Sequence, residues 1–223
     1  MEPKEYQIKT LNRVKQYLDL LYDWRLKAAK IAEEFGEQGV VDFPVTAWKK
    51  VEGLYAPYAS RRDGLGRPLP CFCLEIPTAG GKTFLAVKTI DLINTNYRKL
   101  RTGFVLWVVR STQIYNQTIR SLRNRDHPYR QHLDIASAGR TLIREKTDLF
   151  SPLDVRENLV VLMLMLPSAN RKTKEVLRMF KDREGFADFF PLEDDPEANA
   201  RILEKIPNLD TFEKQTGFFD RID

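Results

Sequence analysis

The feature that most constrains the fold of this chain is a short turn, Gly80-Gly81-Lys82-Thr83, which joins two differently patterned segments. An apolar run, Cys71–Ile76, precedes the turn, and the apolar residues of Lys82–Asn94 follow it at helical spacing. Glycines at a strand-to-helix turn allow backbone N–H groups to face phosphate oxygens, and a lysine beside them adds positive charge. The pattern predicts a phosphate-binding loop. The alternative is a chance Gly-Gly-Lys-Thr turn that only begins a helix.

The full phosphate-loop pattern, Gly-x-x-x-x-Gly-Lys-Thr, is met except at its first position, which is Ile76. In this pattern the lysine reaches the β- and γ-phosphates of a nucleotide, and the threonine ligates Mg²⁺. These roles fall to Lys82 and Thr83. The predicted cofactors are therefore ATP and Mg²⁺.

The N-terminal part of the chain has helical patterning. Tyr6–Phe35 shows three- and four-residue apolar spacing and is predicted to form one long helix or two. Gly36–Gly39 and Pro44 interrupt this pattern, and Ala47–Tyr55 is a second candidate helix. Residues 56–70, rich in glycine, proline and arginine, are predicted to form an exposed loop.

Strand and helix patterns alternate after this loop, which predicts an α/β fold. Continuous apolar runs between helices indicate a parallel sheet covered on both faces. The strand candidates are Cys71–Ile76, Phe104–Val109 after Gly103, Leu133–Ser137 and Leu159–Met165. The helix candidates are Lys82–Asn94, Thr112–Leu122, Arg171–Phe180 and Pro196–Ile206. The predicted domains are a helical extension with its loop at 1–68 and an α/β lobe at 69–223.

Charge is unevenly distributed along the chain. The net charge is +5, but residues 186–223 contain ten acidic and only four basic residues, so the preceding part is strongly basic. A basic body suits a polyanionic partner such as a nucleic acid. The acidic tail, residues 186–223, has no predicted structure or role.

No segment is predicted to enter a membrane, and the chain is expected to be cytoplasmic. The longest apolar run, Leu159–Leu166, is too short to span a bilayer, and the first residues lack the basic-then-apolar order of a signal peptide. Cys71 and Cys73 lie two residues apart on a predicted strand and are expected to be buried free thiols.

Several segments resemble one enzyme family. Pro77-Thr78 followed by Gly-Lys-Thr resembles motif I of superfamily 2 helicases and translocases, whose first position is often not glycine. The segment VLWVVRSTQIYNQT resembles the strand, Ser-Thr-Gln turn and helix of the helicase (Res) subunit of type III restriction enzymes, with Arg110 in place of the usual proline. Further similar segments are NLVVLMLMLPSANR, FFPLEDDPEAN, IPNLDTFE and, near the N-terminus, EYQIKTLNRV.

This resemblance implies a RecA-like P-loop sheet with flanking helices, forming an incomplete first helicase lobe, and a nucleotide site within it. Gln7 matches the glutamine that reads the adenine edge in related enzymes; the alternative is an ordinary exposed helix residue. Thr83 is implied to be the Mg²⁺ ligand. The loop residues implied to hold the triphosphate are Thr78, Gly80, Gly81, Lys82 and Thr83.

The resemblance also implies a contact with the nucleic-acid backbone after the second strand candidate. Ser111 or Thr112 is in addition a good N-cap for the following helix, a role compatible with DNA contact. Ser168 and Asn170 are weaker candidates, because such residues are common in turns. The implied partners are DNA and a modification (methyltransferase) subunit or the missing C-terminal part of the helicase. The implied DNA-contact residues are Arg110, Ser111, Thr112 and Gln113.

Hydrolysis of ATP needs a carboxylate that holds Mg²⁺ and another that positions water. The sequence contains no Asp-Glu dipeptide, and no strand candidate ends in a carboxylate, so no catalytic residue is assigned. The chain is therefore predicted to be the ATP-binding N-terminal portion of a DNA helicase or translocase, inactive alone, as a truncated product or as one piece of a split enzyme. Alternatives are a non-enzymatic nucleotide- or DNA-binding module, or an unrelated P-loop kinase.

Two other features have simpler interpretations. His127 and His132 lack metal-ligand partners in the sequence and are expected to be exposed loop residues. The charged segment Arg120–Arg130 is expected to be solvated helix surface, with nucleic-acid contact as the alternative.

Overall fold

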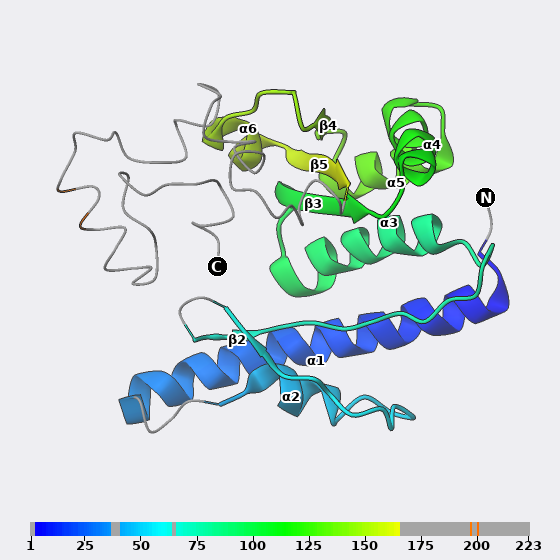
Figure 1. The fold of residues 1–223 in the computed structure, drawn as a ribbon. Helices are drawn as coiled ribbons and strands as arrows, with labels where there is room; N and C mark the ends of the chain where they lie inside the picture. Colours follow the sequence, from blue (N-terminus) through cyan, green and yellow to red (C-terminus); the bar gives the residue numbers. More distant parts are fainter. Residues whose placement is uncertain (1–2, 37–40, 64–65, 166–196, 198–199, 201–223) are drawn as a thin grey trace. The chain divides into compact units, whose positions relative to one another are not determined.

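The computed structural model describes residues 3–36, 41–63, 66–165, 197 and 200. The chain divides into two compact units, and Figure 1 labels most of their helices and strands. The first comprises the chain up to Arg101 together with Gln131–Ala138, and the second comprises Thr102–Arg130 and the described residues from Gly139 onward. In the described ranges, no helix combines the length and apolarity needed to cross a membrane.

The first unit is built on α1, a single 31-residue helix from Glu5 to Phe35. Its buried positions, Val14, Tyr17, Leu18 and Leu21, recur at three- and four-residue spacing, so one face of the helix is apolar. Gly36, with φ +57°, follows its last residue. The long-helix prediction is confirmed.

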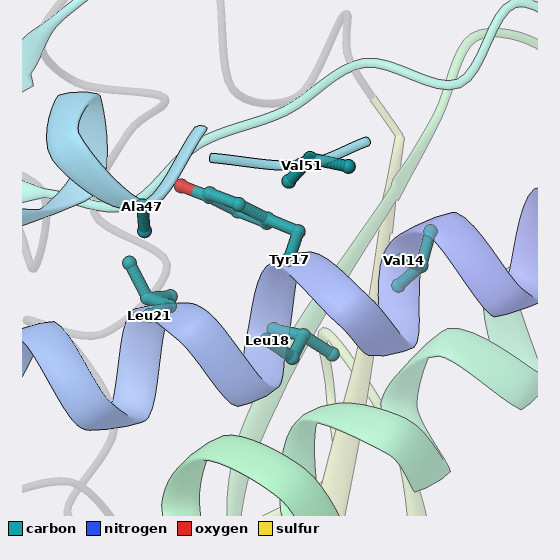
Figure 2. Packing of buried hydrophobic residues seen from close by; sticks show 6 residues of the cluster. All are labelled: Val14, Tyr17, Leu18, Leu21, Ala47 and Val51. Carbon is teal, nitrogen blue, oxygen red and sulfur yellow. The ribbon is translucent and has the colours of Figure 1, made fainter. Parts of the chain in front are cut away.

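A core forms between α1 and α2, which runs from Phe43 to Trp48 (Figure 2). The Tyr17 ring points from α1 toward α2, and its centre lies 5.3 Å from that of Trp48, edge to face. The fully buried core members shown are Val14, Tyr17, Leu18, Leu21, Ala47 and Val51. This core fixes the position of the N-terminal helix within the first unit.

The short helix α2 begins earlier than Ala47, the predicted start. Asp42 caps it, accepting the Val45 N–H at 3.2 Å, and Pro44 lies in its first turn. Proline is favoured there because its missing N–H would have no helical partner. The expectation that Pro44 only interrupts helical structure was therefore wrong.

The predicted loop after α2 contains a two-stranded antiparallel ribbon. Strand β1 is Arg61–Arg62 and strand β2 is Pro68–Leu69. The following apolar run, Cys71–Ile76, was predicted as a strand, but it forms no ladder in the described residues. Instead, Phe72 and Leu74 pack against the α1 core, so the apolar side chains are buried by helices rather than by a sheet.

The alternation along this run also decides the environment of the two thiols. Cys71 and Cys73 alternate with the core-facing Phe72 and Leu74 and lie on the other side of the extended segment. Both cysteines are free, as predicted, but Cys73 is exposed and Cys71 only half-buried. The expectation that they are buried was wrong.

The helix that follows the glycine turn is confirmed. It consists of α3, Lys82–Leu92, continued by a π-helix, η2, from Ile93 to Arg98. Phe84, Leu85 and Val87 are its buried apolar residues. Lys99, in a left-handed conformation, ends η2.

The second unit contains a parallel three-stranded sheet in the order β3-β5-β4. Strand β3 is Gly103–Val109, β4 is Thr141–Glu145 and β5 is Leu159–Met165 (Figure 1). The central strand β5 pairs Leu159 with Gly103 on one side and with Thr141 on the other. The predicted parallel α/β arrangement is therefore present, and two of its strands match the predictions.

Of the two helices that lie wholly in the described part of the second unit, one was predicted from the sequence and the other was not. Helix α4, Thr112–Arg123, was predicted, whereas α6, Pro152–Glu157, was not. Ser151 and Asp154 form a reciprocal capping box at the start of α6, with bonds of 3.2 and 2.8 Å. A core of Phe150, Val160, Leu162 and Leu164 lies beside it, with Phe104 stacked on Phe150 at 5.6 Å.

The third strand prediction was wrong. Leu133–Ser137 forms the end of helix α5, Pro128–Ser137, and the strand follows it as β4. Leu133, Ala136 and Ser137 are buried at helical spacing, which the single apolar run concealed. The candidates at Arg171–Phe180, Ser168 and Asn170, the acidic tail and most of 196–206 lie outside the described residues.

Candidate nucleotide-binding site

The glycine turn is a tight loop that leads directly into α3. The Gly80 N–H donates to the Pro77 carbonyl at 3.0 Å, and Ala79 and Gly81 both have positive φ, +61° and +80°. The Gly81 carbonyl accepts the Leu85 N–H at 2.9 Å, the first turn of the helix. The N–H groups at the start of a helix have no intrahelical partner, and they favour an anion at that end.

Two positions of this loop favour glycine. A Cβ on Gly80 would lie 2.6 Å from Ile76 Cγ2 and 2.9 Å from the Pro77 carbonyl oxygen. A Cβ on Gly81 would lie 2.6 Å from Gln7 Nε2, and its left-handed φ disfavours any side chain. The loop is thus a side-chain-free cradle in which backbone groups can approach a ligand closely.

Lys82 lies at the first position of α3 and is exposed. Its Nζ donates to the Pro77 carbonyl at 3.0 Å, so the ammonium folds back over the loop that it follows. A neutral carbonyl is a weaker acceptor for an ammonium than a phosphate oxygen is. Lys82 is therefore positioned to exchange this bond for a phosphate. Thr83 is half-buried in the same turn and Thr78 is exposed.

The first turn of α1 reaches the loop through two side chains. Gln7 Nε2 donates to the Gly80 carbonyl at 3.0 Å, and the Tyr6 hydroxyl donates to the same oxygen at 2.8 Å. Gln7 Oε1 accepts the Lys4 N–H at 2.9 Å, which caps the helix. Gln7 is 7% exposed, so the alternative of an ordinary exposed glutamine was wrong.

Tyr6 is a loop contact that the sequence interpretation missed. Tyr6 had been interpreted only as part of a helix start. Its position next to Gln7 is the sequence signal that both side chains lie at the same helix end. Both donors converge on one carbonyl, which fixes the Gly80 peptide relative to α1. The cradle is therefore held from outside the loop as well as by its own turn.

His132 is not an exposed loop residue, as was expected. It lies in α5 within the first unit, half-buried, with its ring 5.7 Å from that of Phe84. Burial, and then the positive charge of Lys88, lower the pKa of His132 below its ordinary value, while Asp91 opposes this. His127 is half-buried before α5, and its Nδ1 accepts the Tyr129 N–H at 3.2 Å.

The four candidate DNA-contact residues lie together in the second unit, between β3 and α4. Arg110, Ser111, Thr112 and Gln113 are all exposed. Ser111 is the N-cap of α4, accepting the Ile114 N–H at 3.4 Å, so the predicted capping role is confirmed. Positively charged and N–H-rich, this helix start suits a phosphate.

A strand in the second unit does end in a carboxylate, contrary to the expectation. Glu145 is the last residue of β4, where it pairs with Arg123 and accepts the Tyr115 hydroxyl at 2.9 Å. Burial, and then Glu145 itself, raise the pKa of Tyr115 well above its ordinary value. Arg123 also pairs with Asp148 at 3.1 Å. The Glu145 carboxylate is thus already engaged by neighbouring side chains.

Arg130 corrects the interpretation of Arg120–Arg130 as solvated surface. It is 7% exposed, and its guanidinium donates to the Leu122 carbonyl at 3.2 Å and to the Thr141 carbonyl at 2.9 Å. The side chain therefore joins the end of α4 to the start of β4. A cation at a helix C-terminus is also favoured by the helix dipole.

A glycine cradle at a helix start, with a lysine at the first helical position, places the chain among P-loop nucleotide-binding proteins. The family model of the type III restriction enzyme res subunit matches residues 1–182, and the chain belongs to this family. The domain is RecA-like, so both the predicted fold class and the resemblance are confirmed, as is an ATP-binding module of the helicase and restriction-subunit kind. Neither the curated proteins nor the solved structures contained a match.

In the described residues, no group of three or more histidine, cysteine or acidic side chains is placed to hold a metal ion. Mg²⁺ in a P-loop protein is held largely by the nucleotide phosphates and one loop hydroxyl, so such a group is not required. The predicted domain boundary between residues 68 and 69 separates a helical extension from the α/β lobe of the family, whereas the two compact units are defined by contacts within the chain. The boundary stays a prediction.

Proposed function

We propose that this chain is the ATP-binding N-terminal portion of a DNA helicase or translocase of the type III restriction enzyme kind. The observation that carries the proposal is the cradle at Gly80 and Gly81. It leaves little room for side chains at these two positions and leads directly into the start of α3. Lys82 stands at that helix start with only a loop carbonyl as its acceptor. This combination suits the triphosphate of a nucleotide.

The loop residues divide the work of holding Mg·ATP. Backbone N–H groups of the cradle and the first turn of α3 meet phosphate oxygens, while Lys82 moves from the Pro77 carbonyl to the β- and γ-phosphates. Thr83 supplies the hydroxyl for Mg²⁺, and Thr78 lies on the exposed side of the loop. Bound Mg²⁺ would neutralise phosphate charge.

Gln7 is proposed to recognise the adenine edge. Both ends of its amide already have partners, because Oε1 accepts the Lys4 N–H and Nε2 donates to the Gly80 carbonyl at 3.0 Å and to the Tyr6 hydroxyl at 3.3 Å. A carboxamide oxygen has a second lone pair, whereas Nε2 would have to share or exchange its bond. Base recognition by Gln7 would therefore be coupled to the position of the Gly80 carbonyl.

The DNA backbone is proposed to contact Arg110, Ser111, Thr112 and Gln113. Support comes from their joint exposure at the start of α4 and from the family, whose members act on DNA. Arg110, which replaces the usual proline, adds a charge to this turn. Arg123, at the other end of α4, forms ion pairs with Glu145 and Asp148 and is not included in this contact.

Arg110→Ala is expected to weaken DNA binding and to flatten its salt dependence. Each phosphate contact that is lost lowers the slope of log K against log salt by roughly 0.9 for duplex DNA. The measurement is a salt titration of binding to a labelled duplex. Arg140→Ala is the matched control, since Arg140 is exposed in the same unit and loses the same charge. Equal slopes for the two variants would exclude Arg110 from the DNA path.

The purified chain is expected to release no phosphate from ATP above background, with or without DNA. Cleavage needs a carboxylate that positions water, and the sequence has no Asp-Glu dipeptide. The strand-end carboxylate in the described residues, Glu145, is bound by Arg123 and Tyr115. This observation favours the second candidate function, a nucleotide- or DNA-binding module without catalysis of its own. DNA-stimulated release that Lys82→Ala removes would refute the prediction.

The proposal also includes partner chains and a cellular location. A modification (methyltransferase) subunit or a separate C-terminal helicase part would act together with this chain, and its two free thiols suit a cytoplasmic location. Reconstitution with a chain that carries the Asp-Glu box and a second lobe would be expected to restore hydrolysis.

A further inference from the structure

The surface where α1 meets η2 carries cations stacked on tyrosine rings. The guanidinium carbon of Arg25 lies 4.7 Å from the centre of the Tyr97 ring and 5.4 Å from that of Tyr22. Lys99 Nζ lies 5.0 Å from the centre of the Tyr22 ring. Lys99 is exposed, and the other three side chains are half-buried. We call Tyr22, Arg25, Tyr97 and Lys99 the α1–η2 surface.

Such contacts are concentrated here. Significant cation–aromatic contacts occur about once per 70–80 residues in proteins. In the part of the chain that the structure describes, three of them meet on the α1–η2 surface alone. Two more place Lys27 and Lys50 on Trp24, a ring that, like Tyr97, also packs against the α1 core.

The cations of this surface are not neutralised by direct ion pairs. Among the described residues, no carboxylate oxygen lies within 4.0 Å of the charged nitrogens of Arg25 or Lys99. Asp19 interacts electrostatically with Lys99, but Lys15 and Asn96 already donate to its carboxylate at 2.8 and 2.6 Å. Burial opposes ionisation of Asp19, yet these bonds and the charges of Lys15 and Lys99 hold its pKa below its ordinary value. Net positive charge is left on the surface.

The π-helix holds the surface in place. Asn96 is 8% exposed, and its bond to Asp19 joins η2 to α1. The Leu100 N–H donates to the Asn94 carbonyl at 3.2 Å, and Lys99 adopts φ +56° at the helix end. π-helical turns are rare and occur frequently at functional sites. Tyr97 and Lys99 are therefore presented by a fixed backbone rather than by a loose loop.

We propose that the α1–η2 surface is a second nucleic-acid contact, specific for single strands. Lys99 and Arg25 would meet phosphates, and the tyrosine rings and the Arg25 guanidinium plane would stack on bases. Base faces are available in a single strand but not in a duplex. The existing cation–ring contacts are weak at exposed sites, so bases can displace or extend them. An acidic peptide offers charge without stacking surfaces and fits the rings less well.

This contact goes beyond the proposed function and does not depend on it. It uses neither the glycine cradle nor Arg110, which belongs to the other compact unit. A chain that bound no ATP could still bind a single strand here. Failure of one proposal therefore leaves the other intact.

The test uses the full chain and a short oligothymidylate. Replacing Tyr22 and Tyr97 by leucine keeps apolar packing but removes both rings, and it is expected to weaken binding at least about fivefold, the effect of losing stacking on one base. Replacing both by phenylalanine keeps the rings and should keep the affinity. Tyr55→Leu is the matched control, because Tyr55 is 94% exposed in the same unit and contacts no cation. A thermal melt of each variant checks folding.

Photo-crosslinking of an iodouracil-containing oligonucleotide provides a second readout that does not need a variant. Crosslinks are expected on peptides that contain Tyr22 or Tyr97. Lys99→Ala should lower the salt slope of oligonucleotide binding by roughly 0.7, whereas Lys30→Ala, an exposed lysine of α1, should not.

Three results would overturn the proposal. The first is equal affinity of the leucine and Tyr55→Leu variants, and the second is a phenylalanine variant that binds as poorly as the leucine variant. The third is equal competition by a duplex or by polyglutamate, which would mean that the surface recognises charge alone.

Discussion

Lys82→Ala is expected to abolish detectable binding of Mg·ATP to this chain. Lys82 is the charged side chain of the loop, and its ammonium bonds to the Pro77 carbonyl at 3.0 Å in the part of the chain that the structure describes. A hydrogen bond to a charged group contributes about 1.5–3 kcal/mol, so the loss of even one lowers affinity by roughly tenfold or more. Two phosphate contacts would be lost together. Calorimetric titration with Mg·ATP measures the change.

Lys88→Ala is the matched control for this substitution. Lys88 lies on the same helix, α3, and carries the same charge, but it acts on His132 rather than on the loop. Its removal should leave ATP affinity unchanged. If both variants bind ATP as the unchanged chain does, the loop is not a phosphate site and the proposed function falls. The α1–η2 surface would be unaffected by that outcome.

Arg130→Met should cause the largest loss of stability in the second unit. Methionine fills a similar volume but donates no hydrogen bond, so the Leu122 and Thr141 carbonyls lose a buried charged donor. Two such bonds at about 1.5 kcal/mol or more each predict a loss of about 3 kcal/mol. Because the chain has two compact units, one unfolding midpoint does not isolate this effect. Hydrogen exchange at the amides of β4 and β5 isolates the effect of the substitution on the second unit.

Arg125→Met provides the comparison. Arg125 belongs to the same charged segment, but it is exposed, and surface changes of this kind are usually within about 0.5 kcal/mol. Faster exchange in β4 is expected for the Arg130 variant alone. Equal exchange in the two variants would show that the buried guanidinium adds nothing to the join between α4 and β4.

Long, strongly patterned elements could be predicted from the sequence. The apolar spacing of α1 spans 31 residues, and β5 is a continuous apolar run buried along nearly its whole length. Helix α3 and strand β3 were also predictable, because clear turns adjoin them in the sequence. In α1, α3 and β5 local patterning and tertiary burial agree, so no partner needs to be known in advance, whereas β3 is a strand although Leu106 and Val108 are exposed.

Short elements depended on partners that the sequence does not display. Leu133–Ser137 has a strand-like composition, but its burial follows helical spacing. Strand β4 contains Arg144 and Glu145, and it is a strand because β5 supplies its hydrogen bonds. Conversely, Cys71–Ile76 has apolar alternation without a strand partner in the described residues, and it packs on helices.

The site residues were likewise predictable where their pattern is local and unpredictable where they depend on distant partners. The glycine and lysine positions were predictable, because a phosphate loop is a local backbone pattern. The donation of Tyr6 to Gly80 spans 74 positions of sequence, and the burial of Arg130 depends on carbonyls from two elements. Apart from the adjacent pair Tyr6-Gln7 at the start of α1, such contacts carry no local signal.

The strand order β3-β5-β4 also has a consequence for biosynthesis. The middle strand is the last of the three to leave the ribosome, and β3 and β4 share no ladder with each other. Until Met165 has been added, both edge strands of the nascent chain lack their hydrogen-bonding partner, and apolar residues such as Leu106 have no sheet to join. Long-range parallel pairing is slow and leaves such segments open to aggregation. The sheet of the second unit is therefore expected to form later during translation than the α1–α2 core of the first, which joins neighbouring helices.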